Sequence, residues 1–153
     1  MPFATHILVP TDFSEASQLA IDATSVLARK LGTKVTLVHV HDPSGLRSPA
    51  QIAYSPQRQK SVEEQVVKAC RASLASARDE GLKDVPDVET ALIEDPSPAR
   101  AICDHAEKVG ADLIVISTHG RTGLKSLLIG SVAERVVRHA QMPVLTLRSN
   151  ADD

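Results

Sequence analysis

Five short apolar runs rich in β-branched residues recur along the chain, and their length predicts β-strands. They are residues 6–10 (HILVP), 34–40 (KVTLVHV), 88–93 (VETALI), 112–117 (DLIVIS) and 143–147 (PVLTL). Several of the runs are apolar at nearly every position, which is typical of strands that are covered on both faces. The runs therefore predict a sheet with helices on both sides.

Segments with helical periodicity separate these runs. In the first segment, apolar residues recur at intervals of three and four up to a stop at Gly32; they are Ala16, Leu19, Ala20, Ala23, Leu27 and Leu31. A second helix is predicted over about residues 58–80 and ends at Gly81. Its apolar stripe comprises Val62, Val66, Cys70, Leu74 and Ala77.

Capping signals predict two further helices. Ser97 followed by Pro98 suits the start of a helix that ends at Gly110, because proline lacks only a donor that the first turn leaves unpaired. Ser131 followed by Glu134 matches a capping box, which predicts a fourth helix from residue 131 to about residue 140.

The alternation of strand and helix predicts an α/β fold: a doubly wound, five-stranded parallel sheet of Rossmann-like type with right-handed crossovers. The strand order that we consider is 3-2-1-4-5. A chain of 153 residues fits a single domain, residues 1–153. The proline-containing stretch 42–57 shows neither period, and we expect it to be a flexible loop with a functional role.

Composition and charge exclude several classes of protein. A net charge of −2 and an aromatic content of 2% argue against nucleic acid as a partner. The apolar runs are far shorter than a membrane span, and the first residues lack the features of a signal peptide. Cys70 and Cys103 are isolated, so the sequence indicates neither a disulfide framework nor a zinc site. We therefore expect a cytoplasmic protein without membrane contact.

Polar, turn-forming residues follow the first and fourth apolar runs, as PTDFS (10–14) and STHG (117–120). With the order 3-2-1-4-5 the sheet reverses between these two strands, and ligands bind at the carboxyl ends of strands beside such a switch point. Gly120 and Gly130 can expose N–H donors to an anion at the start of the fourth helix, and Ser131 can add a hydroxyl.

Other residues of the turn leave its role open. Arg121 and Lys125 supply positive charge, although each is equally typical of a solvated surface. Neither the G-x-G-x-x-G fingerprint nor a P-loop is present. On these residues alone, a plain strand-to-helix loop and an anion-binding loop are equally good interpretations.

Segment 117–131 resembles the glycine signature of the universal stress protein family: Gly, two residues, Gly, nine residues, then Gly followed by Ser or Thr. Ser117 stands at the first glycine position, while Gly120, Gly130 and Ser131 match at that spacing. The resemblance also covers ILVPTDFSEAS near the start, LVHV at the end of the second run and most of the last 40 residues. Family members with this signature bind ATP, and the chain resembles that branch.

The resemblance implies an adenine-nucleotide-binding type of fold whose ligand is ATP, either alone or with Mg²⁺ bound to the phosphates. Pro10, Thr11 and Asp12 would border the adenosine, Val40 would contact adenine, and Asp12 could also meet the ribose or a phosphate-bound Mg²⁺. A homodimer through the edge strand 143–148 is similarly implied. The implied cofactor-binding residues are Pro10, Thr11, Asp12, Val40, Ser117, His119, Gly120, Arg121, Gly130, Ser131 and Val132.

Structural roles compete with these assignments. Asp12 also suits a helix N-cap, Val40 a core position and Gly130 a tight turn. His39 and His41 alternate on one strand face, but no third metal ligand has suitable spacing.

Three functional hypotheses follow. The leading one is an ATP-binding stress-response protein, a nucleotide-dependent switch in which loop 42–57 changes order on binding. The second is a dimeric protein-interaction module that binds no nucleotide. The third is a slow ATPase in which His119 positions water; because no G-x-S-x-G elbow occurs, we expect a binding protein and no efficient enzyme.

Overall fold

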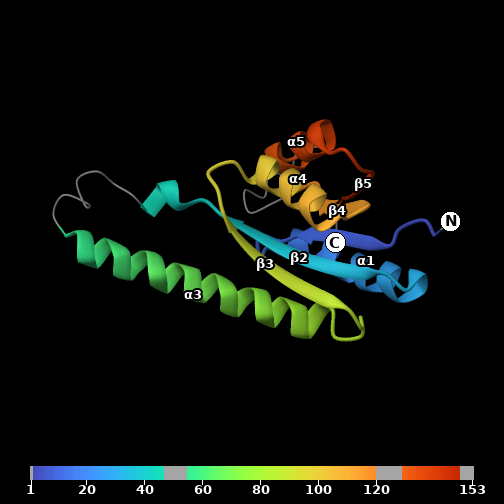
Figure 1. Cartoon of the computed structure of the whole chain (residues 1–153), viewed down its shortest axis with the longest axis horizontal. Coiled ribbons are helices and arrows are strands. Elements are labelled where there is room, and N and C mark those ends of the chain that lie inside the picture. Colours follow the sequence, from blue (N-terminus) through green and yellow to red (C-terminus); the bar gives the residue numbers. More distant parts are fainter. Residues whose placement is uncertain (1, 47–54, 120–128, 149–153) are drawn as a thin grey trace.

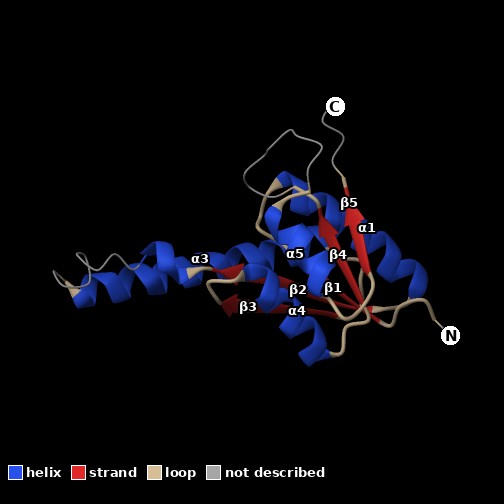
Figure 2. Cartoon of the chain, turned by 90° about the horizontal axis from the view of Figure 1, so that it is seen from above, coloured by secondary structure: helices blue, strands red, loops and turns tan. Residues whose placement is uncertain are grey.

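One parallel sheet organises the chain, and the computed structural model describes residues 2–46, 55–119 and 129–148 of it. Figure 2 shows the strands side by side in the order β3-β2-β1-β4-β5, which confirms the predicted order. Each strand lies within two residues of its predicted run. The strands are β1 (His6–Pro10), β2 (Lys34–His41), β3 (Val88–Glu94), β4 (Leu113–Ser117) and β5 (Val144–Leu147).

Helices cover both faces of the sheet (Figure 1), as the apolar runs predict. Ile7 and Val9 of β1 pack in a core with α1 and α3, whereas Leu8 packs in a second core with α4 and α5. Because neighbouring residues of β1 point into different cores, all of them are buried. The helices are α1 (Glu15–Leu31), α3 (Pro56–Gly81), α4 (Pro98–Val109) and α5 (Ser131–His139), with a short 3-10 helix η1 at Pro43–Leu46.

The buried face of α1 differs in part from the predicted stripe. Leu19 and Leu31 are 42% and 37% exposed. The buried residues are Ser17, Ala20, Ile21, Thr24 and Ala28. Thr24 fits this face because its hydroxyl donates to the Ala20 carbonyl at 2.7 Å, which satisfies a polar group inside the core.

The predicted second helix is present as α3, but its apolar stripe is wrong over the first half. Only Leu74 of that helix is fully buried, and Val62 is 40% exposed. The first half of α3 runs past the ends of the strands (Figure 1), so it has no sheet to pack against. Of the predicted loop 42–57, residues 43–46 form η1, α3 begins at Pro56, and residues 47–54 lie outside the described part of the chain.

Left-handed glycines end two helices as predicted. Gly32 after α1 has φ 67° and Gly110 after α4 has φ 71°, a conformation that disfavours other residues. At the start of α4, Ser97 is the N-cap residue and Pro98 the first helical residue, although the Ser97 side chain makes no capping hydrogen bond. None of the helices in the described ranges is long and apolar enough to cross a membrane.

Candidate functional site

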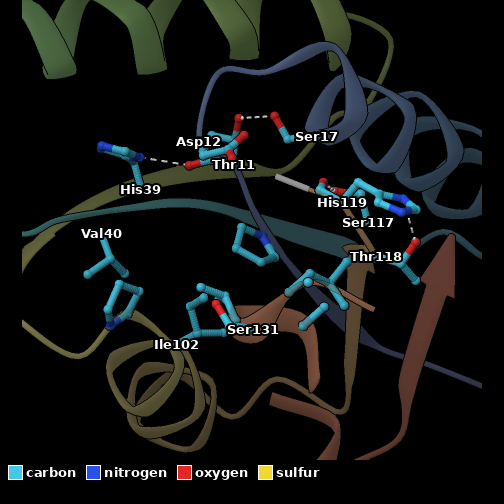
Figure 3. A pocket seen from close by; sticks show the side chains of 16 residues that line it. Thr11, Asp12, Ser17, His39, Val40, Ile102, Ser117, Thr118, His119 and Ser131 are labelled. Atoms are coloured by element: carbon cyan, nitrogen blue, oxygen red, sulfur yellow. Dashed lines mark hydrogen bonds between the residues drawn. The ribbon is translucent and has the colours of Figure 1, made fainter. Parts of the chain in front are cut away.

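A cavity of about 280 Å³ lies where the sheet reverses, at the carboxyl ends of β1 and β4 (Figure 3). This is the place where open α/β sheets bind their ligands. The cavity takes residues from four regions of the chain: residues 10–17 between the end of β1 and the first turn of α1, the end of β2, the start of α4, and the residues on either side of 120–128.

Most of the site residues predicted from the sequence line this cavity. They are Pro10, Thr11, Asp12, Val40, Ser117, His119, Gly130, Ser131 and Val132. Gly120 and Arg121, together with Lys125, lie outside the described residues. The sequence analysis did not assign Ser17, His39, Pro98, Ile102, Ile116, Thr118 or Ala133 to the site, although all of them line it.

Hydrogen bonds fix the turn after β1. The Thr11 amide donates to the Val38 carbonyl at 2.8 Å, which extends the β1–β2 pairing by one residue. The Thr11 hydroxyl accepts from the Phe13 amide at 3.0 Å and lies 3.0 Å from the Ser17 hydroxyl. Thr11 is buried and its polar atoms are engaged within the protein, so it shapes the wall of the cavity.

Asp12 is not the N-cap of α1, contrary to the structural alternative considered for it. Ser14 holds that position, since its hydroxyl accepts from the Ser17 amide at 3.2 Å. The Asp12 carboxylate accepts from the Ser14 amide at 3.0 Å and from the Ser14 hydroxyl. Asp12 therefore lies two residues before the N-cap, where it lines the cavity.

The same turn holds a strained residue. Phe13 has φ 65°, a left-handed value that costs a bulky side chain energy. Its ring packs on the ring of His39, with the centroids 4.5 Å apart. The Nδ1 atom of His39, which is buried, lies 2.7 Å from the Thr11 carbonyl oxygen. Figure 3 shows the His39 ring beside Thr11, joined to it by this hydrogen bond.

The end of β4 is closely joined to the start of α5. The Gly130 amide donates to the Thr118 carbonyl oxygen at 2.5 Å. A Cβ atom at Gly130 would lie 2.9 Å from that oxygen, closer than real Cβ atoms come to backbone. Ser117, at the first glycine position of the signature, donates its hydroxyl to the His119 carbonyl at 2.9 Å. Gly130 is thus required by a close approach of two backbone segments.

The predicted capping box at the start of α5 is wrong. The N-cap residue is Gly130, Ser131 is the first helical residue, and no side chain caps the helix. With Gly130 at the N-cap, Glu134 lies one residue beyond the position that a capping box requires, and its carboxylate accepts from Arg138 at 2.7 Å. The first backbone hydrogen bond of the helix is Glu134 N–H to the Gly130 carbonyl at 2.9 Å.

That arrangement leaves backbone N–H donors of the first helical turn at the cavity. The amides of residues 131–133 precede the first helical hydrogen bond, so the helix itself supplies no acceptor for them. Such amides, together with the positive end of the helix dipole, attract a phosphate or carboxylate. Ser131, Val132 and Ala133 all line the cavity.

Apolar side chains also line the cavity. They are Val40 at the end of β2, and Pro98 and Ile102 of α4. The apolar stripe of α4 predicted only a core helix, because the same stripe serves the core and the cavity together. Among the described lining residues, Asp12 is the one carboxylate, and no group of three His, Cys, Asp or Glu in the described residues could hold a metal ion.

Comparison with known proteins identifies the family of the chain. The model of the "Universal stress protein family" matches residues 4–148. Universal stress protein MJ0531 of Methanocaldococcus jannaschii is 35% identical over 145 aligned positions, and the match covers 93% of this chain and 81% of that protein.

Solved structures have the same fold. The structure of MJ0577, a universal stress protein of the same archaeon, gives a TM-score of 0.82 at 28% identity and covers 97% of this chain and 98% of that one. A universal stress protein solved in complex with cAMP gives a TM-score of 0.70 at 23% identity, covering 96% and 98% of the two chains.

Proposed function

Because the chain belongs to the universal stress protein family, we propose that it binds an adenine nucleotide in the cavity at the β1–β4 switch point and acts as a nucleotide-dependent switch. One observation carries the proposal. A single cavity combines an uncapped helix N-terminus at one end with an apolar slot at the end of β2. The universal stress protein that was solved with cAMP supports the class of ligand.

The phosphates of the nucleotide would lie against the start of α5. Three backbone amides and the Ser131 hydroxyl are available there, and the close contact of Gly130 with Thr118 fixes their position relative to β4. A single helix terminus stabilises an exposed anion by about 0.3–1 kcal/mol, so several donors have to act together. We propose ATP as the ligand, with Asp12 as the carboxylate nearest to any phosphate-bound Mg²⁺.

The base would occupy the slot between Val40, Pro98 and Ile102. These side chains offer an apolar surface for the flat faces of a purine, but they carry no hydrogen-bonding group. Recognition of the base edge therefore falls to backbone groups. Affinity from such contacts alone is moderate, which suits a switch that responds to nucleotide concentration.

Calorimetric titration with ATP tests the proposal, with ADP, AMP and cAMP as further ligands and GTP as a control for the base. We expect saturable binding of at least one adenine nucleotide and much weaker binding of GTP. Mass spectrometry of any small molecule that copurifies would identify the ligand directly. Flat titrations with every adenine nucleotide would favour a protein-interaction module instead.

An exposed sheet edge supports a homodimer as the assembly of this protein. In β5, the carbonyls of Pro143 and Leu147 accept from Ile114 and Thr118, so the odd-numbered residues face β4. The N–H and C=O groups of the even-numbered residues, including Thr146, therefore point outward from the edge. Self-pairing of two such edges about a two-fold axis would satisfy these groups.

A further inference from the structure

The main chain of β2 alternates between its two neighbouring strands, which fixes where Val40 points. The Lys34 amide donates to the Thr5 carbonyl at 3.1 Å, and the Val38 carbonyl accepts from the Thr11 amide at 2.8 Å. Even-numbered residues of β2 therefore face β1, since every second residue of a parallel strand bonds to the same neighbour. Val40 follows this rule and presents its N–H and C=O toward the turn after β1.

The turn after β1 does not pair with those groups. Continued at the same spacing, the ladder would join the Val40 amide to the Thr11 carbonyl and the Phe13 amide to the Val40 carbonyl. The Thr11 carbonyl instead lies 2.7 Å from Nδ1 of His39, and the Phe13 amide donates to the Thr11 hydroxyl at 3.0 Å. Both of the groups of this turn that would pair with Val40 are thus engaged elsewhere.

His39 keeps the Thr11 carbonyl and Phe13 from pairing with Val40 through two interactions. Its Nδ1–H donates to the Thr11 carbonyl, and its ring packs on Phe13, which is held at the strained φ of 65°. Since His39 is buried and the ring contact is close, the surrounding structure fixes both interactions. The result is a strand end at which Val40 keeps one donor and one acceptor beside an apolar cavity.

We propose that His39 is a positioning residue of the nucleotide site: by engaging the Thr11 carbonyl and Phe13, it leaves the Val40 N–H and C=O available to the edge of the base. The inference rests on the proposed function for the ligand, but the lack of pairing between Val40 and the turn after β1 is a property of the protein alone. Adenine carries an amino donor next to a ring-nitrogen acceptor, which complements a neighbouring carbonyl and amide. A backbone group that is left unpaired beside apolar side chains is costly, so a base that pairs with it is favoured.

Amide hydrogen exchange of the nucleotide-free protein tests whether the Val40 N–H lacks a partner in the turn after β1. We expect the Val40 amide to exchange much faster than the Val38 amide. In His39→Leu, which removes the donor, the Val40 amide pairs with the Thr11 carbonyl and exchanges at least tenfold more slowly. His39→Asn, whose amide nitrogen can replace Nδ1, keeps the fast exchange. Equal protection of Val40 and Val38 in the wild-type protein would overturn the proposal without any variant.

Ligand binding tests the consequence, with ATP and inorganic tripolyphosphate as probes. We expect His39→Leu to bind ATP about tenfold more weakly, the equivalent of one hydrogen bond, and to bind tripolyphosphate unchanged. The affinity of His39→Asn for ATP stays near that of the wild type. Equal ATP affinity in the wild type and in His39→Leu would overturn the role of His39. A wild-type protein that binds neither probe would overturn the proposed function.

Discussion

Replacement of Gly130 by alanine perturbs the junction between β4 and α5 with a single methyl group. The new Cβ would lie 2.9 Å from the Thr118 carbonyl oxygen, and that oxygen belongs to the backbone, so it cannot rotate away. The backbone angles of Gly130, φ −59° and ψ 153°, suit alanine as well as glycine. Any effect of the substitution therefore comes from the contact and not from the backbone conformation.

The cost of this contact follows from packing and hydrogen bonding. Overpacking of this kind costs about 1–3 kcal/mol. If the helix start moves away to relieve it, the hydrogen bond from the Gly130 amide weakens, with a further loss of about 0.5–1.5 kcal/mol. The amides of residues 131–133 move with the helix start. We therefore expect ATP to bind roughly 10- to 100-fold more weakly, at 1.4 kcal/mol for each factor of ten.

Calorimetric titration with ATP and urea denaturation of the same samples measure the two effects. Gly45→Ala is the matched control, because a Cβ atom at Gly45 meets nothing within 4 Å. It should leave both the ATP affinity and the free energy of unfolding unchanged. The reasoning is refuted if Gly130→Ala binds ATP as the wild type does and is equally stable, or if Gly45→Ala loses as much.

Three further predictions concern stability and assembly. Asp112 accepts hydrogen bonds from the amides of Thr5 and His6, and Asp112→Asn should lower the free energy of unfolding by about 1–3 kcal/mol in urea titrations at neutral pH. Burial raises the pKa of the Asp112 carboxyl, but hydrogen bonds from the Thr5 hydroxyl and from the amides of His6 and Thr5 outweigh it and lower the pKa. This contribution to stability is therefore present at neutral pH and is lost as pH falls below about 4; an Asp112→Asn variant that loses as much stability in acid as the wild type would contradict this. Burial lowers the pKa of His6 below its ordinary 6.5, so its ring resonance in NMR spectra should titrate below that pH. The free energy of unfolding should decrease as the pH falls and the ring becomes protonated, and a titration midpoint above about 6.5 would contradict a buried, neutral ring. Thr146→Pro removes an N–H group that points outward from the edge strand β5, and it should yield monomers in sedimentation experiments. Thr90→Pro removes an outward N–H group from the other edge strand, β3, and should leave a dimer; dimers of both variants would contradict the β5 interface.

The sequence predicted the sheet well because its strands are buried on both faces. Every residue of β1 is buried, and a run of that kind has few alternatives to a central parallel strand. Gly32 and Gly110 marked helix ends correctly, since both take the left-handed conformation. Convergence of the β1 and β4 ends then followed from strand order alone, which is why most of the predicted site residues line one cavity.

Local hydrogen bonds decided the features that the sequence did not reveal. Ser17 and Thr24 are buried in α1 because their hydroxyls find partners within one turn, so a hydrophobic stripe cannot identify that face. Ser131 lost its predicted capping role because the contact between Gly130 and Thr118 sets where α5 begins. Both outcomes depend on distances between backbone segments, which periodicity does not contain.

The location of the ligand is best tested by amide NMR spectra of the ¹⁵N-labelled protein titrated with ATP. We expect saturable shifts at Thr11, at Val40 and at residues 131–133, from three segments far apart in sequence, all following one binding curve. Saturable shifts confined to α3 or β3, or no shifts at millimolar ATP, would contradict it.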